Sequence, residues 1–158
     1  KGTGEPLLAS NIFSMVRKLR QTASKKVALL TNCSLLSHPQ VLQGLPEFDI
    51  IIAKLDAANE NTFQQVNRPH PSIRFSDLLQ GLKEARDSFP GSFRIEVTLV
   101  RENIDELDDI AQLCREICPD YVYLNHPDHC DPFHQVSKRE VQAAMQKFVG
   151  IRCLSAEE

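Results

Sequence analysis

The sequence predicts an α/β domain built on a parallel β-sheet, and three observations support this. Segments rich in β-branched and aliphatic residues recur along the chain, with amphipathic helical patterns between them. Three of the four strand segments are almost continuously apolar, which is typical of strands covered on both faces. The alternation of strand and helix implies right-handed βαβ crossovers. An open sheet and a partial barrel both agree with this order.

The expected strands occupy residues 26–31, 48–53, 93–100 and 121–124. The third strand differs from the others because Arg94, Glu96 and Thr98 alternate with apolar residues. One face of that strand therefore needs polar surroundings, and we expect this face to line a site.

Helical patterns fill the intervals between these strands. Ser10 is the candidate N-cap of the first helix, and Ser76 is the candidate N-cap of a long helix that ends at Phe89-Pro90-Gly91. Asn103 with Glu106 has the spacing of a capping box ahead of a helix that stops at Pro119.

The last helix begins at a second capping-box pattern, Ser137 with Glu140. We assign residues 1–150 to a single domain and residues 151–158 to a C-terminal tail. A chain of 158 residues, of which 42% are hydrophobic, can bury a core without disulfides or a structural metal.

Charge and composition argue against nucleic-acid and membrane partners. The net charge is -3 and no basic block is present, which disfavours broad nucleic-acid binding. The longest apolar run contains Asp49 and is much shorter than a membrane span of about 20 residues. The first residues have no signal-peptide pattern. Because the chain starts at Lys1 and not at an initiator Met, we expect a processed product or a piece of a longer protein. Five irregularly spaced cysteines indicate a reducing compartment, and we predict a cytoplasmic location.

Polar residues follow the expected strands, at the edge where parallel α/β sheets bind ligands. Asp56 can accept hydrogen bonds from ligand hydroxyl or amino groups, with Lys54 to balance its charge; the alternative is a cap for a helix over residues 59–66. Glu96 either faces a ligand or forms an ion pair with a neighbouring cation on the same face of the sheet.

Histidine and cysteine residues cluster after the fourth strand. His126, His129, Cys130 and His134 can in principle hold zinc or a softer metal, although their spacing is irregular and a solvated loop is the competing interpretation. Cys114 and Cys118 share a helix face, which favours burial as small hydrophobic residues.

In chain order, several strings resemble the radical S-adenosylmethionine (radical SAM) superfamily, and more narrowly its small, uncharacterised iron-sulfur oxidoreductases. The resemblance covers about residues 2–127, and Asn67-Arg68-Pro69-His70-Pro71 is its most specific part. The other matching strings are Gly4-Glu5-Pro6, residues 27–32, Leu55-Asp56-Ala57, Ile95-Glu96-Val97 and Leu124-Asn125.

This resemblance implies a partial parallel (β/α) barrel, namely strands two to six of a (β/α)6 core. It also implies a four-iron four-sulfur cluster and SAM as cofactors, with SAM cleaved reductively to a 5'-deoxyadenosyl radical. The residues that would contact SAM are Thr3, Gly4 and Glu5, at the methionyl amino group, and Asn32, Asp56, Glu96 and Asn125, at the strand ends.

The sequence also departs from the family pattern. It contains no Cys-x3-Cys-x2-Cys motif, Cys33 replaces a usual Gly, and Lys54 replaces a Ser. We therefore expect a fragment of a radical SAM enzyme that is inactive alone and binds neither cofactor tightly. The alternatives are a diverged, non-catalytic binding module of the same fold and a metal-binding domain that uses the 126–134 loop. We expect self-association through an exposed barrel edge.

Overall fold

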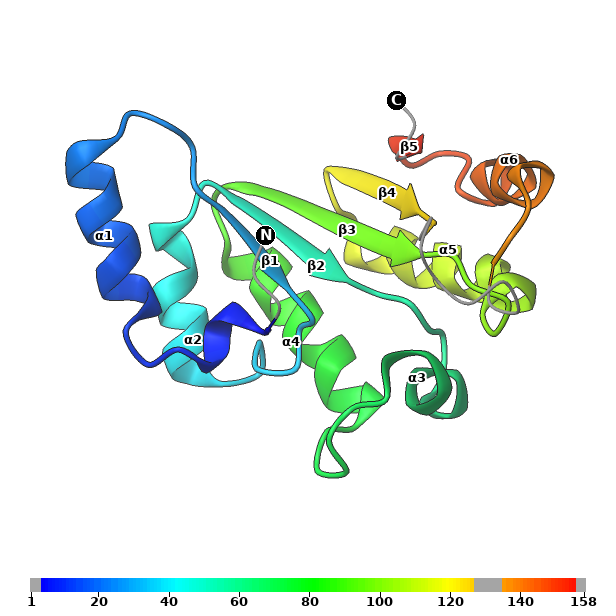
Figure 1. The fold of residues 1–158 in the computed structure, drawn as a ribbon, viewed down its shortest axis with the longest axis horizontal. Helices are drawn as coiled ribbons and strands as arrows, with labels where there is room; N and C mark the ends of the chain where they lie inside the picture. The colour runs from blue at the N-terminus through cyan, green and yellow to red at the C-terminus, as the bar shows by residue number, and fades with distance from the viewer. Residues whose placement is uncertain (1–3, 127–134, 156–158) are drawn as a thin grey trace.

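A computed structural model describes residues 4–126 and 135–155 of the chain (Figure 1). Its five strands form one parallel sheet in the order β1-β2-β3-β4-β5. The strands are β1 (Ala28–Thr31), β2 (Ile50–Lys54), β3 (Ser92–Thr98), β4 (Tyr121–Asn125) and β5 (Cys153–Ser155). Because neighbours in the chain are also neighbours in the sheet, the strands wind in one direction, as in a barrel. The predicted α/β fold with a partial parallel barrel is confirmed.

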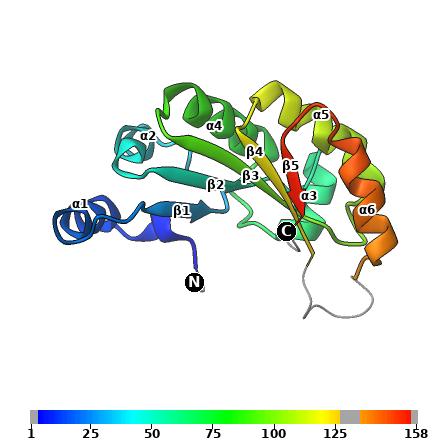
Figure 2. The ribbon, with the colours of Figure 1, turned by 90° about the horizontal axis from the view of Figure 1, so that it is seen from above.

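The helices connect these strands and pack mainly on one side of the sheet. Figure 2 shows α2, α4 and α5 together on the outer side of the curved sheet. The α-helices are α1 (Ile12–Thr22), α2 (Pro39–Gly44), α3 (Glu60–Asn67), α4 (Phe75–Ser88), α5 (Leu107–Ile117) and α6 (Lys138–Lys147). Three short 3-10 helices are η1 (Pro6–Leu8), η2 (Leu45–Glu47) and η3 (Ile104–Glu106). In the described part of the chain, no helix is long and apolar enough to cross a membrane.

Burial alternates along β1 to β4, so the two faces of the sheet differ. The residues that face the helices are fully buried, among them Ile51, Phe93 and Val122. The residues between them, such as Ile52, Arg94 and Tyr121, are only half-buried. We call this second side the inner face. The prediction that three strands are covered on both faces is wrong for the described residues, because the helices pack on one side.

The predicted helix caps are partly confirmed. Ser137 and Glu140 form the expected capping box at the start of α6. Helices α1 and α4 begin after Asn11 and Arg74, so Ser10 and Ser76 do not cap them.

The capping box predicted at Asn103 and Glu106 is also wrong. The Asn103 side-chain amide does not cap the helix; it donates to the carbonyl oxygens of Asp56 and Thr98, at 2.8 Å each. The Glu106 carboxylate instead accepts hydrogen bonds from Asn59 and Thr62 of the α3 region.

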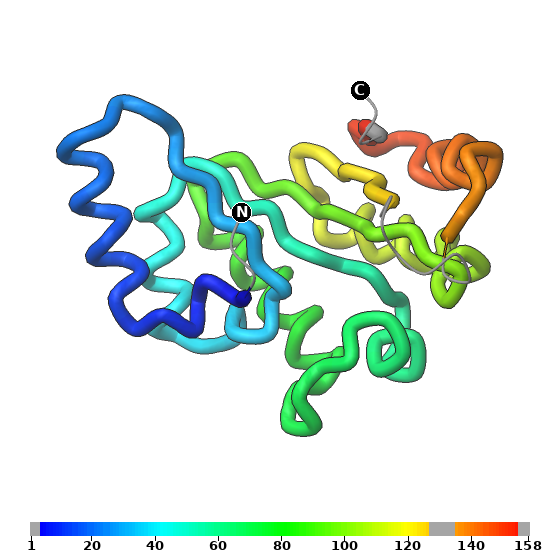
Figure 3. The backbone as a smooth tube through the Cα atoms, in the orientation of Figure 1, coloured from blue at the N-terminus to red at the C-terminus, as the bar shows by residue number. Residues whose placement is uncertain are grey.

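The C-terminal region contains a strand that the sequence pattern does not predict. Residues 151–158 are expected to form a tail, yet β5 lies within them and pairs with β4, placing Val122 opposite Cys153. The predicted burial of Cys114 is confirmed, whereas Cys118 is exposed because it ends α5 in the left-handed conformation, at φ 55°. Figure 3 traces the path, with the N-terminal segment returning to the carboxyl end of β1.

Candidate functional site

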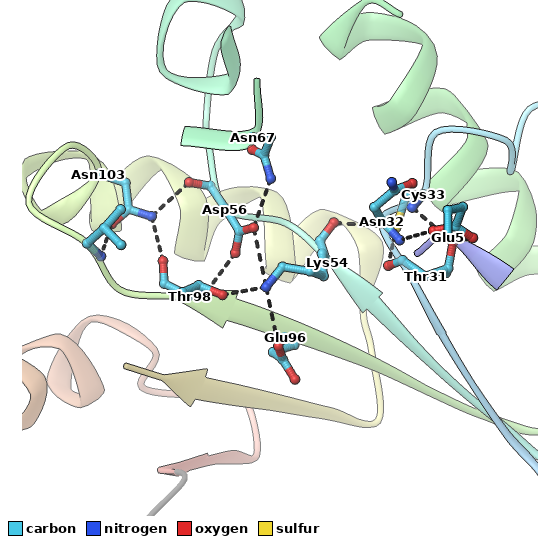
Figure 4. Close-up of polar contacts among 11 residues, drawn as sticks. Glu5, Thr31, Asn32, Cys33, Lys54, Asp56, Asn67, Glu96, Thr98 and Asn103 are labelled. Carbon is cyan, nitrogen blue, oxygen red and sulfur yellow. Dashed lines mark hydrogen bonds and ion pairs between the residues drawn. The ribbon is translucent and has the colours of Figure 1, made fainter. Parts of the chain in front are cut away.

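The carboxyl ends of β2 and β3 bring four polar residues together, which we call the strand-end cluster: Lys54, Asp56, Glu96 and Thr98 (Figure 4). The parallel register places Lys54 directly opposite Glu96 on the inner face. Side chains at paired positions of adjacent strands are close enough to interact. The sheet register therefore builds this cluster from residues that are distant in the sequence.

Asp56 is the buried centre of the cluster, with a side chain only 3% exposed. One carboxylate oxygen accepts from the Thr98 backbone N–H at 2.6 Å, and the other accepts from the Asn67 amide at 2.9 Å. Helix α3 is capped by Asn59, whose side chain accepts from the Thr62 N–H. Asp56 is thus not a helix cap; it joins the end of β2 to β3 and α3.

Lys54 links the two carboxylates. Its ammonium group lies 3.3 Å from Glu96 Oε1 and 3.5 Å from Asp56 Oδ2, and it also donates to the Thr98 hydroxyl. The alternative in which Glu96 pairs with a neighbouring cation on the sheet is confirmed. Two carboxylates against one ammonium leave the cluster with a net negative charge.

Glu5 fixes the N-terminal segment to the end of β1. Its carboxylate accepts from the Thr31 hydroxyl at 2.9 Å, the Asn32 N–H at 2.7 Å and the Leu7 N–H at 3.2 Å. The structure therefore brings together Glu5 and Asn32, two of the residues that the resemblance assigns to SAM. A Cβ built on Gly4 would contact nothing within 4 Å, so its backbone is open to a ligand. Thr3 lies outside the described residues.

Cys33 lies between Glu5 and the strand-end cluster. It adopts φ 69°, a left-handed conformation that normally favours glycine, and its Sγ lies 3.4 Å from the Lys54 carbonyl oxygen. Burial raises the pKa of its thiol well above the usual range, with the Glu5 charge as a smaller contribution. The thiol therefore remains protonated and acts as a packing group.

A cavity of about 620 Å³ opens between the loop after β1 and the loop that joins α3 to α4, and no residue of the strand-end cluster lines it. Glu5, Asn32 and Asn67 border it, together with Arg68 and His70 of the most specific string of the resemblance. Asn67 Oδ1 is shielded from solvent and has no hydrogen-bond partner among the described residues. The sequence analysis assigns no role to Asn67. Its place in the string Asn67-Arg68-Pro69-His70-Pro71, the most specific part of the resemblance, was the feature that could have indicated one.

The remaining predicted residues lie on β4 and just beyond it. Asn125 is half-buried and pairs in register with Thr98, so it borders the strand-end cluster on the inner face. His126 follows directly, whereas His129, Cys130 and His134 lie outside the described residues. Within residues 4–126 and 135–155, no three His, Cys, Asp or Glu side chains are placed to hold a metal ion.

Sequence comparison identifies curated relatives, and no family model matches the chain. A "GTPase Obg" of Brachyspira hyodysenteriae is 35% identical over 78% of this chain and 18% of its own length. A UPF0026 protein of Synechocystis is 30% identical over 85% of this chain and 51% of its own. A probable GTP 3',8-cyclase of Sulfurisphaera tokodaii is 24% identical over 77% and 38%, respectively. The chain spans about half or less of the length of these relatives.

Comparison of folds identifies similar solved structures. A domain of pyruvate-formate lyase-activating enzyme from Bacteroides vulgatus matches with a TM-score of 0.80 at 16% identity, covering 98% of this chain and 96% of that one. A radical SAM methyltransferase from Sphaerobacter thermophilus matches with a TM-score of 0.74 at 20% identity, covering 98% and 48%. Streptococcus suis SuiB, solved with SAM bound, matches with a TM-score of 0.69 at 13% identity, covering 96% and 37%. The chain has the fold of these proteins, so the resemblance to the superfamily is confirmed at the level of the fold.

Proposed function

We propose that this chain is the part of a radical SAM iron-sulfur enzyme that holds S-adenosylmethionine at the carboxyl ends of its strands. The observation that carries the proposal is the net negative strand-end cluster, built on the inner face of a fold shared with radical SAM enzymes. A cofactor with an amino group, a ribose and a sulfonium requires carboxylates and amides at such a position.

The side chains present fit such a ligand. Only one oxygen of Glu96 is engaged, by Lys54, and the Asn125 side-chain amide makes no hydrogen bond within residues 4–126 and 135–155. These two groups are available to a ribose or an adenine, and Gly4 leaves the backbone open beside Glu5. Asp56 is buried and fully engaged, so in this proposal it orients Lys54 and Thr98 instead of touching the cofactor.

Bound SAM would supply a 5'-deoxyadenosyl radical after reductive cleavage. The residues of this chain would bind and orient it. Lys54 neutralises part of the negative charge of the cluster. Its ammonium would repel the sulfonium of SAM and weaken SAM binding, unless Asp56 and Glu96 balance that positive charge.

The four-iron four-sulfur cluster does not fit the residues of this chain. The sequence contains no Cys-x3-Cys-x2-Cys motif, and the described residues offer no group of three metal ligands. We propose that the cluster of the whole enzyme is held by residues outside this sequence, and we derive no step through it. The chain alone is then expected not to cleave SAM.

Equilibrium dialysis of this chain against radiolabelled SAM tests the cofactor site. We expect weak, saturable binding that falls about tenfold in Glu96→Gln, because a charged hydrogen-bond acceptor becomes neutral. Arg139→Met, on the exposed surface of α6, is the control and is expected to bind as the wild type does. Absence of saturable binding, or equal binding by Glu96→Gln, would contradict the SAM site.

Iron and sulfide analysis after anaerobic reconstitution tests the enzyme assignment. The full-length parent protein is expected to take up about four irons, and this chain none. If this chain alone binds metal stoichiometrically, the metal-binding domain that uses the 126–134 loop becomes the better proposal. If neither protein binds metal, the non-catalytic binding module becomes the better proposal, and the charge-neutralising Lys54 already favours it.

We also propose that the chain associates with itself through the β1 edge. Among the described strands, β1 pairs only with β2, which leaves its outer edge without a partner. Leu8, Met15 and Leu19, on η1 and α1, are large apolar side chains that are at least 48% exposed. Unpaired edges and apolar patches promote association. Light scattering over a concentration series should show a rising mass, and a constant monomer mass would contradict it.

A further inference from the structure

A second polar group lies on the inner face, one row closer to the amino ends of the strands, and we call it the tyrosine–arginine cluster. It consists of Arg94 on β3, Tyr121 and Tyr123 on β4, and Arg152 just before β5. The register places Arg94 directly opposite Tyr121. Figure 2 shows β3, β4 and β5 side by side in this part of the sheet.

The Arg94 guanidinium is held by the two tyrosines. It lies 5.4 Å from the centre of the Tyr121 ring and 5.9 Å from that of Tyr123, and it donates to the Tyr123 hydroxyl at 2.9 Å. Its Nε donates to the Ser92 hydroxyl at 3.1 Å. A guanidinium has five N–H donors, so these bonds orient Arg94 and leave further donors free.

A second guanidinium faces the same ring. Arg152 lies 5.7 Å from the centre of Tyr121 and donates to its hydroxyl. Neither arginine forms an ion pair with a carboxylate in the described part of the chain, and Glu96, on the same face, pairs with Lys54. Two cations that share one aromatic ring without a counter-charge repel each other.

Arg94 is half-buried and pre-oriented, and a carboxylate or phosphate can form charge-assisted, forked hydrogen bonds with such a guanidinium. Arg94 Nη2 makes no hydrogen bond with the described residues and is not among the solvent-shielded atoms that lack a partner, so solvent reaches it. The inner face thus presents an oriented guanidinium with an unused donor at this position.

We propose that the tyrosine–arginine cluster binds the carboxylate or phosphate group of a small-molecule ligand. The anion would be held by the forked donors of Arg94, with Arg152 adding charge and Tyr121 forming the wall between them. The proposal of an anion-binding site does not depend on the proposed function. Only the identification of this ligand as the substrate rests on the proposed function.

In that case the geometry also limits the substrate. Arg94 and Thr98 are four residues apart on β3, which corresponds to about 13 Å along a strand. An anion at Arg94 therefore positions the remainder of a substrate toward the strand ends, where we propose that SAM binds. The substrate class is an anionic molecule long enough to span that separation.

Tyrosine fluorescence tests the anion site directly. The sequence contains two Tyr and no Trp, and both tyrosines belong to this cluster, so the intrinsic emission reports on this site alone. Inorganic phosphate and succinate are titrated separately into the full chain at constant ionic strength, with sodium chloride as the reference. We expect a saturable change in emission with at least one of the two anions.

Arg94→Met is expected to weaken this binding about tenfold or more, since it removes a charge-assisted fork and keeps an apolar stem between the rings. Arg94→Lys keeps the charge but loses the fork, and should give an intermediate affinity. Arg139→Met is the control. Circular dichroism checks that each variant is folded. If Arg94→Met does not fold, Arg152→Met provides a second test of the anion site.

A linear change that matches sodium chloride, or saturation with equal affinity in Arg94→Met and Arg152→Met, would overturn the anion site. The titration contains no SAM and no iron, so this failure is distinct from failure of the proposed function. Conversely, Arg94→Met is expected to bind SAM with unchanged affinity in dialysis.

Discussion

Two clusters on the inner face of the same sheet differ in how their charges are balanced. In the strand-end cluster, the Lys54 ammonium lies within 3.5 Å of two carboxylates, and Asp56 is bonded on both oxygens. In the tyrosine–arginine cluster, Arg94 and Arg152 share one aromatic ring and form no ion pair with a carboxylate of the described residues.

The difference distinguishes charges that are largely balanced within the protein from charges that have no acidic partner among the described residues. Buried charges are tolerated when partners and hydrogen bonds satisfy them, and removing one partner is then costly. Arg94 is half-buried and Arg152 is exposed, so solvent still reaches these charges, and they are available to an external anion. Asp56→Ala should therefore mainly lower the free energy of unfolding, whereas Arg94→Met should mainly lower the affinity for an anion.

The largest effect is expected for Asp56→Ala. The substitution leaves the Thr98 N–H and the Asn67 amide without their acceptor and removes one partner of Lys54. We expect the free energy of unfolding to fall by about 2–4 kcal/mol in urea denaturation. Asp56→Asn retains the shape and one acceptor, so it should lose less. A loss below about 0.5 kcal/mol, the range of ordinary surface substitutions, would show that the network is not structural.

A smaller effect is expected for the Lys54–Glu96 pair. The two side chains are 32% and 18% exposed, so solvent screens part of their attraction. A double-mutant cycle with Lys54→Met and Glu96→Gln should give a coupling energy of about 0.5–1 kcal/mol that decreases with added salt. A coupling energy of zero at low salt would show that the Lys54–Glu96 ion pair does not stabilise the strand-end cluster.

The same Lys54→Met variant sharpens the proposed cofactor site. Removing the ammonium makes the cluster more negative, and a cationic ligand should then bind several-fold more tightly at low salt. Equilibrium dialysis with SAM measures this change. Weaker SAM binding would mean that Lys54 itself holds the cofactor.

Arg94→Met should hardly change stability. The variant loses cation–π contacts but also relieves the repulsion between two guanidinium groups. We expect a change of about 0.5 kcal/mol or less in urea denaturation without added anion. A loss as large as that of Asp56→Ala would make Arg94 a structural residue and end the contrast between the clusters.

The smallest effect concerns an exposed, fully matched pair at the start of α6. Hydrogen bonds from Arg101, and then from Ser137, lower the pKa of Glu140 from 4.5 to about 2. A lowered pKa stabilises the folded state above pH 4.5, and this contribution is lost as the pH falls from 4.5 toward 2. The stability difference between wild type and Glu140→Gln should therefore shrink over that interval. A constant difference would show that the charge of Glu140 has no role in the cap.

Local sequence patterns predict most of the fold. The apolar segments identify β1 to β4 within a few residues, and Ser137 with Glu140 identifies the start of α6, because strand burial and capping depend on nearby residues. β5 is not predicted, since a strand of three residues has little pattern of its own and forms only by pairing with β4.

Asn103 shows why local patterns fail near the site. Its spacing to Glu106 is that of a capping box, yet its amide is bonded to the carbonyls of Asp56 and Thr98. Glu106 likewise contacts α3. Partners from distant segments compete with the local cap, and only the folded sheet brings them within reach.

By itself, the sequence determined the α/β class, the positions of the strands and the polar residues that end them, because periodicity and composition are local properties. It also indicated that Arg94, Glu96 and Thr98 share one face of β3. Tertiary structure decided how these charges are matched. The register places Lys54 beside Glu96 and Arg94 beside Tyr121, and pairing across strands depends on which residues the sheet aligns. For that reason Lys54 partly balances the carboxylates of one cluster, whereas the guanidinium groups of the other have no acidic partner among the described residues.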